Sequence, residues 1–251
     1  MREAFQRIAT EFGTAKMEPL SGHPLARYIR EDAATQVRDA LPARYQPFLV
    51  HGSPGVGNWA EIPWIAVFDP AITESATRGY YVVYLFSADL HRVYLSLNQG
   101  TTIVRQEFGA GYVDELRRRA ALMRGRLSEH RDRFSDAAID LASDAYLPRG
   151  YEAGHALGQA YDTSSLPSDD ELAADLASTM SLYLFLRSRG GVLPLEDAGD
   201  EAAEEHTETI IERRRYRLHR SVERDSSAGR KAKKVHGYVC QGCGFNFEAV
   251  Y

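Results

Sequence analysis

Residues 55–98, GVGNWAEIPWIAVFDPAITESATRGYYVVYLFSADLHRVYLSLN, decide the fold. Three apolar runs in this stretch are rich in Val, Ile, Tyr, Phe and Trp and are bounded by Gly, Pro, Asp or Ser. This pattern predicts consecutive strands at Ile62–Phe68, Gly79–Phe86 and Arg92–Leu97. The segment Ser87–His91 between the last two runs is short enough for a hairpin.

Side-chain alternation along a strand assigns the faces of these runs. In the middle run one side carries Tyr81, Val83 and Leu85, and the other carries Tyr80, Val82, Tyr84 and Phe86. Both sides are apolar, so we expect this strand to be covered on both faces, at least in part. In the first run Trp64, Ala66 and Phe68 share a side.

A loop with two glycines and an aromatic residue, Gly55–Trp59, precedes the first strand. Such a loop can approach a ligand closely, because glycine has no side chain to keep the backbone away. The alternative interpretation is a plain three-stranded core meander with no ligand.

Length and composition set the class of protein. A chain of 251 residues that is 44% hydrophobic suits one large domain or two small ones. The net charge of −5 neither supports nor excludes DNA as a partner, because positive charge can be concentrated locally. No apolar run is long enough to span a membrane and no signal peptide is recognisable, so we expect a cytoplasmic protein. Two cysteines do not make a disulfide framework.

Helical spacing of apolar residues predicts helices at Arg2–Phe12, Pro24–Leu41, Tyr112–Leu127 and Phe134–Ala145. A further helix is predicted from Ser168 to Arg189, because Ser168 and Glu171 form a capping-box pattern. Short strands are expected at Pro47–Val50 and Ala153–Tyr161, with a turn at Leu147–Tyr151. The helix at Tyr112–Leu127 also carries a basic face, which is either solvated or a phosphate-contacting patch: Arg117, Arg118, Arg119, Arg124 and Arg126.

The prediction is therefore an α+β fold: a central mixed, mostly antiparallel sheet flanked by helices, within residues 1–190. A charged linker helix is predicted for residues 191–235. Residues 196–212 contain eight acidic residues and no Lys or Arg, whereas residues 213–234 contain ten basic and two acidic residues. This order complements the helix dipole. The candidate phosphate contacts in the basic half are Arg213, Arg214, Arg215 and Arg217.

The order of residues in the deciding stretch resembles the N-terminal DNA-binding domain of McrB-type modification-dependent restriction enzymes. The residues that carry the resemblance are Gly55, Gly57, Asn58, Trp59, Ile62, Pro63, Trp64, Ile65, Ala66, Val67, Phe68, Gly79, Tyr80, Tyr81, Val83 and Leu85. It is most specific over residues 55–98 and continues loosely to about Arg189. It implies a domain that grips duplex DNA, flips out a modified cytosine and holds it in an aromatic-lined pocket.

Carried over to this chain, the resemblance implies a modified-base pocket formed by Trp64, Tyr81, Leu85 and Tyr151. Stacking on an aromatic ring is worth roughly 1–3 kcal/mol per base, which offsets the cost of unstacking it. The glycine loop is the candidate DNA wedge. The best-known family member has an aromatic residue where Val56 stands, so Val56, Asn58 and Trp59 all stay open as the wedging residue. Arg149, beside the pocket tyrosine, is a further candidate phosphate contact.

The last stretch, HGYVCQGCGFNFEAVY at residues 236–251, contains Cys240 and Cys243 in CxxC spacing. One such pair is half of a tetrahedral zinc site, although redox pairs share the spacing. The string resembles the opening of an HNH nuclease domain, which implies structural zinc and a divalent metal such as magnesium for cleavage. No catalytic core follows, so we expect a fragment cut inside the nuclease domain; a nuclease remnant is the alternative.

Together these inferences predict a reader of modified cytosine (5-methyl, 5-hydroxymethyl or N4-methyl) in double-stranded DNA. It would flip the base and target a modification-dependent HNH restriction endonuclease. No Walker motif is present, so no GTP-driven motor is expected in this chain. The alternatives are a non-enzymatic DNA-reading adaptor that dimerises, and an RNA-binding module that prefers single strands. A homodimer is one open assembly state.

Overall fold

The computed structural model describes residues 1–128 and 134–192, all within one compact unit that spans Met1–Leu195. The predicted linker helix and the HNH-like end lie outside the described residues. The same holds for the candidates Arg213, Arg214, Arg215, Arg217, Cys240 and Cys243. These predictions, and the predicted domain boundaries, therefore stay predictions.

Within the described residues five strands form one sheet in the order β1-β2-β3-β4-β5. The strands are β1 (Leu49–Ser53), β2 (Trp64–Phe68), β3 (Tyr80–Phe86), β4 (Arg92–Gln99) and β5 (Leu157–Asp162). All four neighbouring pairs are antiparallel, so the predicted α+β class is confirmed and the expected mixed sheet is corrected. The short connection between β3 and β4 favours this arrangement for that pair, because a tight turn reverses the chain.

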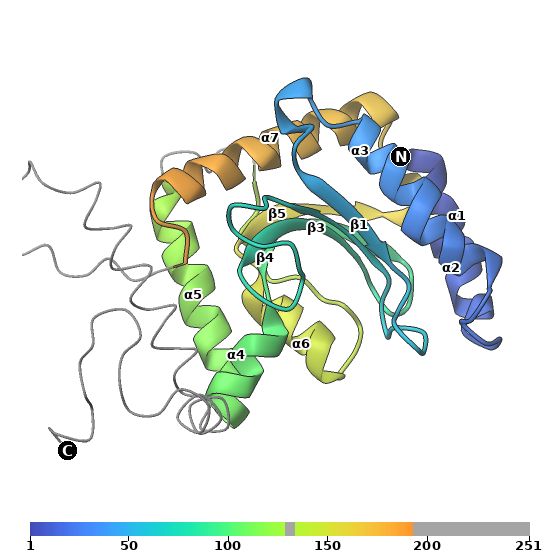
Figure 1. Cartoon of the computed structure of the whole chain (residues 1–251), viewed down its shortest axis with the longest axis horizontal. Helices are drawn as coiled ribbons and strands as arrows, with labels where there is room; N and C mark the ends of the chain where they lie inside the picture. Colours follow the sequence, from blue (N-terminus) through green and yellow to red (C-terminus); the bar gives the residue numbers. More distant parts are fainter. Residues whose placement is uncertain (129–133, 193–251) are drawn as a thin grey trace, which may run out of the picture. The chain divides into compact units, whose positions relative to one another are not determined.

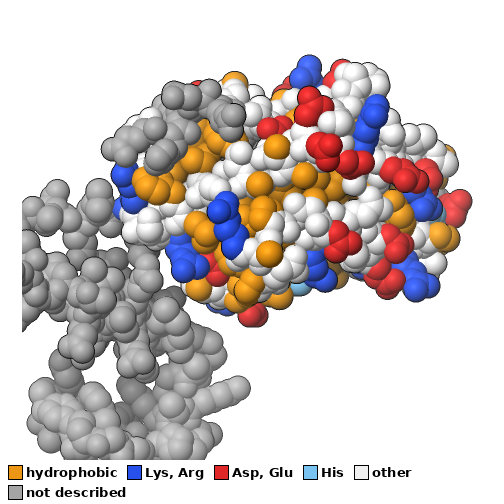
Figure 2. Space-filling view, turned by 90° about the horizontal axis from the view of Figure 1, so that it is seen from above, with side chains coloured by type: hydrophobic (Ala, Val, Ile, Leu, Met, Phe, Trp, Pro, Cys, Tyr) orange, Lys and Arg blue, Asp and Glu red, His pale blue; other side chains and the backbone are white. Residues whose placement is uncertain are grey.

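One face of the sheet packs against helices from both ends of the described chain (Figure 1). These elements are α1 (Arg2–Ala15), α2 (Pro24–Tyr28), the π-turn η1 (Ile29–Ala33), α3 (Ala34–Asp39), the 3₁₀ turn η2 (Ala43–Tyr45) and α7 (Asp169–Ser188). The side chains of Tyr80, Val82, Tyr84 and Phe86 enter this main core. From the α7 side, hydrophobic side chains gather across the middle of the surface and many acidic ones lie toward one end (Figure 2).

The other face is crossed by α6 (Tyr146–Gly154), which lies on the opposite side of the sheet from α7 (Figure 1). Beside it stand α4 (Thr101–Phe108), the turn η3 (Gly109–Gly111) and α5 (Tyr112–Arg126), and the turn η5 (Thr163–Ser165) follows β5. Val104, Leu116 and Ala153 join α4, α5 and α6 in a small core of their own. The predicted helix at Tyr112–Leu127 is thus confirmed as α5, while α4 had no counterpart in the predictions.

The predicted helix at Phe134–Ala145 is wrong, because the segment is a loop. Three side chains in it accept hydrogen bonds from backbone amides two residues later: Ser135 from Ala137, Asp140 from Ala142 and Ser143 from Ala145. Short polar side chains of this kind offer the backbone an alternative to helical bonds. The apolar residues Ile139 and Leu141 are buried by packing on the sheet.

Two neighbouring predictions also change. The segment Leu147–Tyr151 lies inside α6 and is not a turn; Pro148 is tolerated because the first turn of a helix has no internal partner for its N–H. The last strand is Leu157–Asp162, so the predicted start at Ala153 is too early.

The remaining helix predictions largely hold. The reciprocal bonds between Ser168 and Glu171 are present at the start of α7, so the capping box is confirmed. The predicted helix at Pro24–Leu41 is found as α2, η1 and α3, with the π-turn at Ile29–Ala33 interrupting it.

Candidate nucleic-acid interface

The four side chains predicted for the pocket belong to one apolar cluster on the α6 side of the sheet. Strand register explains this for the sheet residues: Trp64 pairs with Leu85, and Tyr81 lies two positions before Val83, the partner of Ala66. Tyr151 joins them from α6. We name this surface the aromatic face; its members are Trp64, Ala66, Phe68, Tyr81, Leu85, Tyr94 and Tyr151.

Members of the aromatic face differ in exposure. Tyr81 and Leu85 are each 1% exposed and Tyr151 is 6% exposed, whereas Trp64 is half-buried. Trp64 is therefore the pocket candidate that a ligand reaches first. Contact with the rings of Tyr81 and Tyr151 requires the side chains above them to move.

Hydrogen bonding and burial set the chemistry of the two tyrosines. The Tyr81 hydroxyl lies 3.1 Å from the Ala76 carbonyl oxygen and 3.4 Å from that of Gln99. Burial raises the pKa of both Tyr81 and Tyr151 well above that of a free phenol. Both groups therefore stay protonated, and the face offers neutral rings that suit an uncharged planar ligand.

A polar network on β4 holds α6, and with it Tyr151, against the sheet. Asn98 donates from Nδ2 to the Tyr151 carbonyl oxygen at 3.0 Å, and Gln99 donates from Nε2 to the carbonyl oxygens of Gly154 and Leu116. These amides are fully buried and tie three elements together. Sequence reasoning missed them, because polar residues in a strand do not reveal their partners.

The loop at residues 134–145 covers another part of the aromatic face. The Leu141 carbonyl oxygen accepts from the Ala88 amide at 2.8 Å, and the Tyr94 hydroxyl accepts from the Asp140 amide. Toward the edge strand β1 the face is more open, because His51 is exposed and its ring lies 5.6 Å from that of Phe68. The sequence predictions did not include His51, although its alternation in β1 could have suggested it.

The glycine loop projects Val56 into solvent. Val56 is 93% exposed and stands between Gly55 and Gly57, whose φ angles are 129° and 72°. Glycine is favoured at such angles, since other residues rarely adopt them. Asn58 is exposed as well.

Trp59 is instead an anchor of this loop. Its indole N–H donates to the Glu18 carbonyl oxygen at 2.7 Å, and its ring packs edge-on against Phe12 and His23. Of the three wedge candidates, Val56 and Asn58 are thus at the tip of the loop, and Trp59 is at its base.

Basic side chains near the aromatic face include the predicted Arg149, which is exposed on α6. Arg78 and Arg92 are exposed too; Arg92 shares the side of β4 that carries Tyr94. The alternation of β4 could have indicated Arg92 from sequence.

The basic face predicted on α5 is largely engaged within the protein. Arg118 and Arg119 both bind Glu115, and the hydrogen bond from Arg118 lowers the pKa of that carboxyl to about 2. Arg126 is buried and donates to the Gly191 carbonyl oxygen, so its predicted place on an exposed face is wrong. Its neighbours Leu127 and Met123 draw this end of α5 into the main core.

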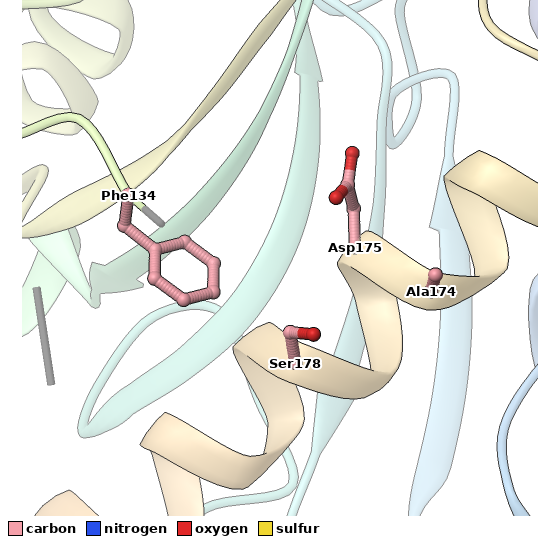
Figure 3. A pocket seen from close by; sticks show the side chains of 4 residues that line it. All are labelled: Phe134, Ala174, Asp175 and Ser178. Atoms are coloured by element: carbon pink, nitrogen blue, oxygen red, sulfur yellow. The ribbon is translucent and has the colours of Figure 1, made fainter. Parts of the chain in front are cut away.

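A separate cavity of about 290 Å³ lies beside α7, on the main-core side of the sheet (Figure 3). Phe134, Ala174, Asp175 and Ser178 line it. Asp175 accepts a hydrogen bond from the Tyr161 hydroxyl at 2.8 Å. None of the predicted pocket residues belongs to this cavity.

In residues 1–128 and 134–192 no group of three or more His, Cys, Asp or Glu side chains is placed to hold a metal ion. In the same part of the chain no helix is long and apolar enough to cross a membrane.

These features define an α+β domain whose five-stranded antiparallel sheet has a helix-covered core on one side and an aromatic face on the other, with a glycine loop between β1 and β2. The family model of the MrcB-like N-terminal domain matches residues 7–188. The chain therefore belongs to the MrcB-like N-terminal domain family, which confirms the resemblance carried by residues 55–98 and indicates a DNA-related role. No curated protein matches the chain.

Proposed function

We propose that this domain recognises a modified cytosine in duplex DNA by flipping the base onto the aromatic face. Family membership supports a role with DNA. The observation that carries the finer proposal is that Trp64, Tyr81, Leu85 and Tyr151, from two strands and one helix, share one apolar cluster, and that Trp64 begins the strand that follows the glycine loop. A flipped base needs such a surface, because it loses its stacking partners when it leaves the duplex.

In this proposal Trp64 stacks on the extruded base first, since it is the half-exposed member of the four. Its indole N–H has no partner among the described residues, so it can donate to the ligand. Tyr81, Leu85 and Tyr151 form the floor and wall beneath. A methyl group on the cytosine ring adds apolar area, which this floor favours.

Val56 is the proposed wedge. Its exposure at the loop tip and the packing of Trp59 at the loop base both favour this choice. Arg149, together with Arg78 and Arg92, is the proposed set of phosphate contacts on this side of the sheet. Such contacts orient the duplex without reading its sequence.

The proposal extends to the targeting of an HNH nuclease, for which the support is the sequence of residues 236–251 alone. Cys240 and Cys243 are the proposed zinc ligands, and magnesium or a similar ion is the proposed cleavage cofactor of an intact enzyme. Arg213, Arg214, Arg215 and Arg217 are proposed to add phosphate contacts.

The test is the variant Trp64→Ala, titrated against duplexes that are identical except for C, 5-methyl-C, 5-hydroxymethyl-C or N4-methyl-C. Loss of one stacked ring should weaken binding to the preferred modified duplex by roughly tenfold to a hundredfold, or about 1–3 kcal/mol. Binding to unmodified duplex should change far less, because phosphate contacts dominate there.

Phe108→Ala is the matched control, since Phe108 is also a partly exposed aromatic residue but belongs to α4. It should leave all four affinities unchanged. Melting curves of both variants establish that they are folded. An equal loss on modified and unmodified DNA would show that Trp64 is general scaffold and would refute the assignment.

A further inference from the structure

The loop that carries Val56 is braced from outside by an arginine. Arg30 donates from Nη2 to the Gly55 carbonyl oxygen at 3.0 Å. The Gly55 amide donates to the Ser53 hydroxyl at 3.3 Å, and the Ala60 amide closes the loop on the Pro54 carbonyl oxygen at 2.8 Å. Both the backbone N–H and the carbonyl oxygen of Gly55 are thus hydrogen-bonded.

An unusual helical turn places Arg30 where it can do this. Arg30 belongs to the π-turn η1, and this turn packs tightly on β1: a side chain on Gly52 would put its Cβ 1.9 Å from the Ile29 carbonyl oxygen. π-turns inside α-helices are rare and frequently mark functional positions. Here the turn and the missing side chain of Gly52 bring the helix beside the start of the glycine loop.

The loop is anchored at its other end by Trp59, which bonds the Glu18 carbonyl oxygen. Between the two anchors only Val56, Gly57 and Asn58 extend into solvent. A glycine-rich loop left unbraced would have to be ordered when DNA binds, and that ordering lowers affinity.

We infer that Arg30 is a positioning residue that holds the glycine loop in the shape that presents Val56 to the duplex; the DNA part of this inference rests on the proposed function. Arg30 acts through the Gly55 carbonyl oxygen and not through its charge alone. It therefore governs the step in which the base leaves the stack more than the initial encounter with DNA.

The experiment compares Arg30→Ala with Arg27→Ala. Arg27 lies on α2 and is ion-paired with Glu31 at 2.8 Å, so its removal changes the net charge equally without touching the loop. Each variant is titrated against a modified duplex and its unmodified counterpart, with a fluorescent base analogue at the modified position as the signal of unstacking.

Arg30→Ala should weaken binding to the modified duplex by about tenfold, the size expected for one lost hydrogen bond from a charged donor, and should reduce the fluorescence gain. Its affinity for unmodified duplex should match that of Arg27→Ala. Equal losses on both duplexes for both variants would show that Arg30 contributes only charge and would overturn the inference.

Amide hydrogen exchange of the free protein separates this inference from the proposed function. The backbone amides of residues 55–60 should exchange faster in Arg30→Ala than in the wild type or Arg27→Ala. If the wild type shows no preference for modified DNA but exchange accelerates as expected, the proposed function fails and the bracing stands. Unchanged exchange in Arg30→Ala would refute the bracing whatever the DNA result.

Discussion

At the scale of single residues, neighbouring positions on the aromatic face differ in exposure and in hydrogen bonding. Trp64 is half-buried and has no hydrogen-bond partner in the described part of the chain, whereas Tyr81 is almost fully buried and its hydroxyl is bonded to two backbone carbonyl oxygens. Sequence alternation could place Tyr81 and Leu85 on one side of a strand. It could not distinguish an aromatic ring that is exposed to solvent from one that is buried beneath the surface.

Tyr81→Phe tests this difference. The variant keeps the ring but leaves the carbonyl oxygens of Ala76 and Gln99 without this donor. We expect the free energy of unfolding, measured with urea, to fall by about 1 kcal/mol.

Binding of Tyr81→Phe to modified duplex should stay close to that of the wild type, because the stacking ring is retained. A large loss of affinity with unchanged stability would instead mean that the hydroxyl contacts the ligand directly.

At the scale of elements, α6 is the part that sequence patterns describe least well and that the site needs most. It carries Tyr151 and Arg149, and its position depends on close contact with α4. A Cβ on Gly150 would lie 2.2 Å from Cγ2 and 2.6 Å from Oγ1 of Thr101. Glycine at this position therefore sets the approach of the two helices.

Gly150→Ala should displace α6 and destabilise the protein by about 1–3 kcal/mol, as overpacking of a filled interior does. Thermal or urea unfolding measures the loss, and affinity for modified duplex reports the displacement of Tyr151.

Adding Thr101→Ala provides the control, since it removes the two atoms that clash. The Thr101 hydroxyl has no hydrogen-bond partner, so its removal breaks no such bond. The double variant should recover much of the stability lost in Gly150→Ala. If the stability loss of the double variant equals the sum of the losses of the two single variants, the contact with Thr101 is not the cause of the destabilisation in Gly150→Ala.

At the scale of the whole molecule, one buried histidine links folding to pH. His155 is 5% exposed between α6 and β5, its Nδ1 lies 2.7 Å from the Ser96 hydroxyl, and Asn98 donates to the same hydroxyl. Burial, with a smaller contribution from Arg124, lowers the pKa of His155 to about 4. The neutral ring can accept the Ser96 proton, so the folded protein keeps the imidazole uncharged.

The unfolded chain takes up this proton near pH 6.5, and the folded protein only near pH 4. Above pH 6.5 the ring is neutral in both states and stability is unaffected; as the pH falls from 6.5 toward 4, the free energy of unfolding should decrease. The full effect is on the order of 3 kcal/mol. Urea unfolding at pH 7, 6, 5.5 and 5 measures the slope.

His155→Gln should remove this slope between pH 6.5 and 5, whatever its absolute stability. His91→Gln, at a side chain that is 81% exposed, should retain it. A His155→Gln slope equal to that of the wild type would mean that other groups cause the pH dependence.

The sequence by itself determined the strands β2, β3 and β4, the helices α1, α5 and α7 with its capping box, and the family. These features depend on local patterns: period-2 alternation, helical spacing, and the Ser168–Glu171 pair. The tertiary structure decided that Phe134–Ala145 is a loop, that α6 holds Tyr151 on the sheet, and that Arg126 is buried. It also decided that Trp59 anchors the base of the glycine loop, that Val56 projects from its tip into solvent, and that Arg30 holds the loop by a hydrogen bond to Gly55. The physical reason is that each of these outcomes is set by partners distant in sequence, such as Glu18 for Trp59 and Gly191 for Arg126, which no local pattern of residues contains.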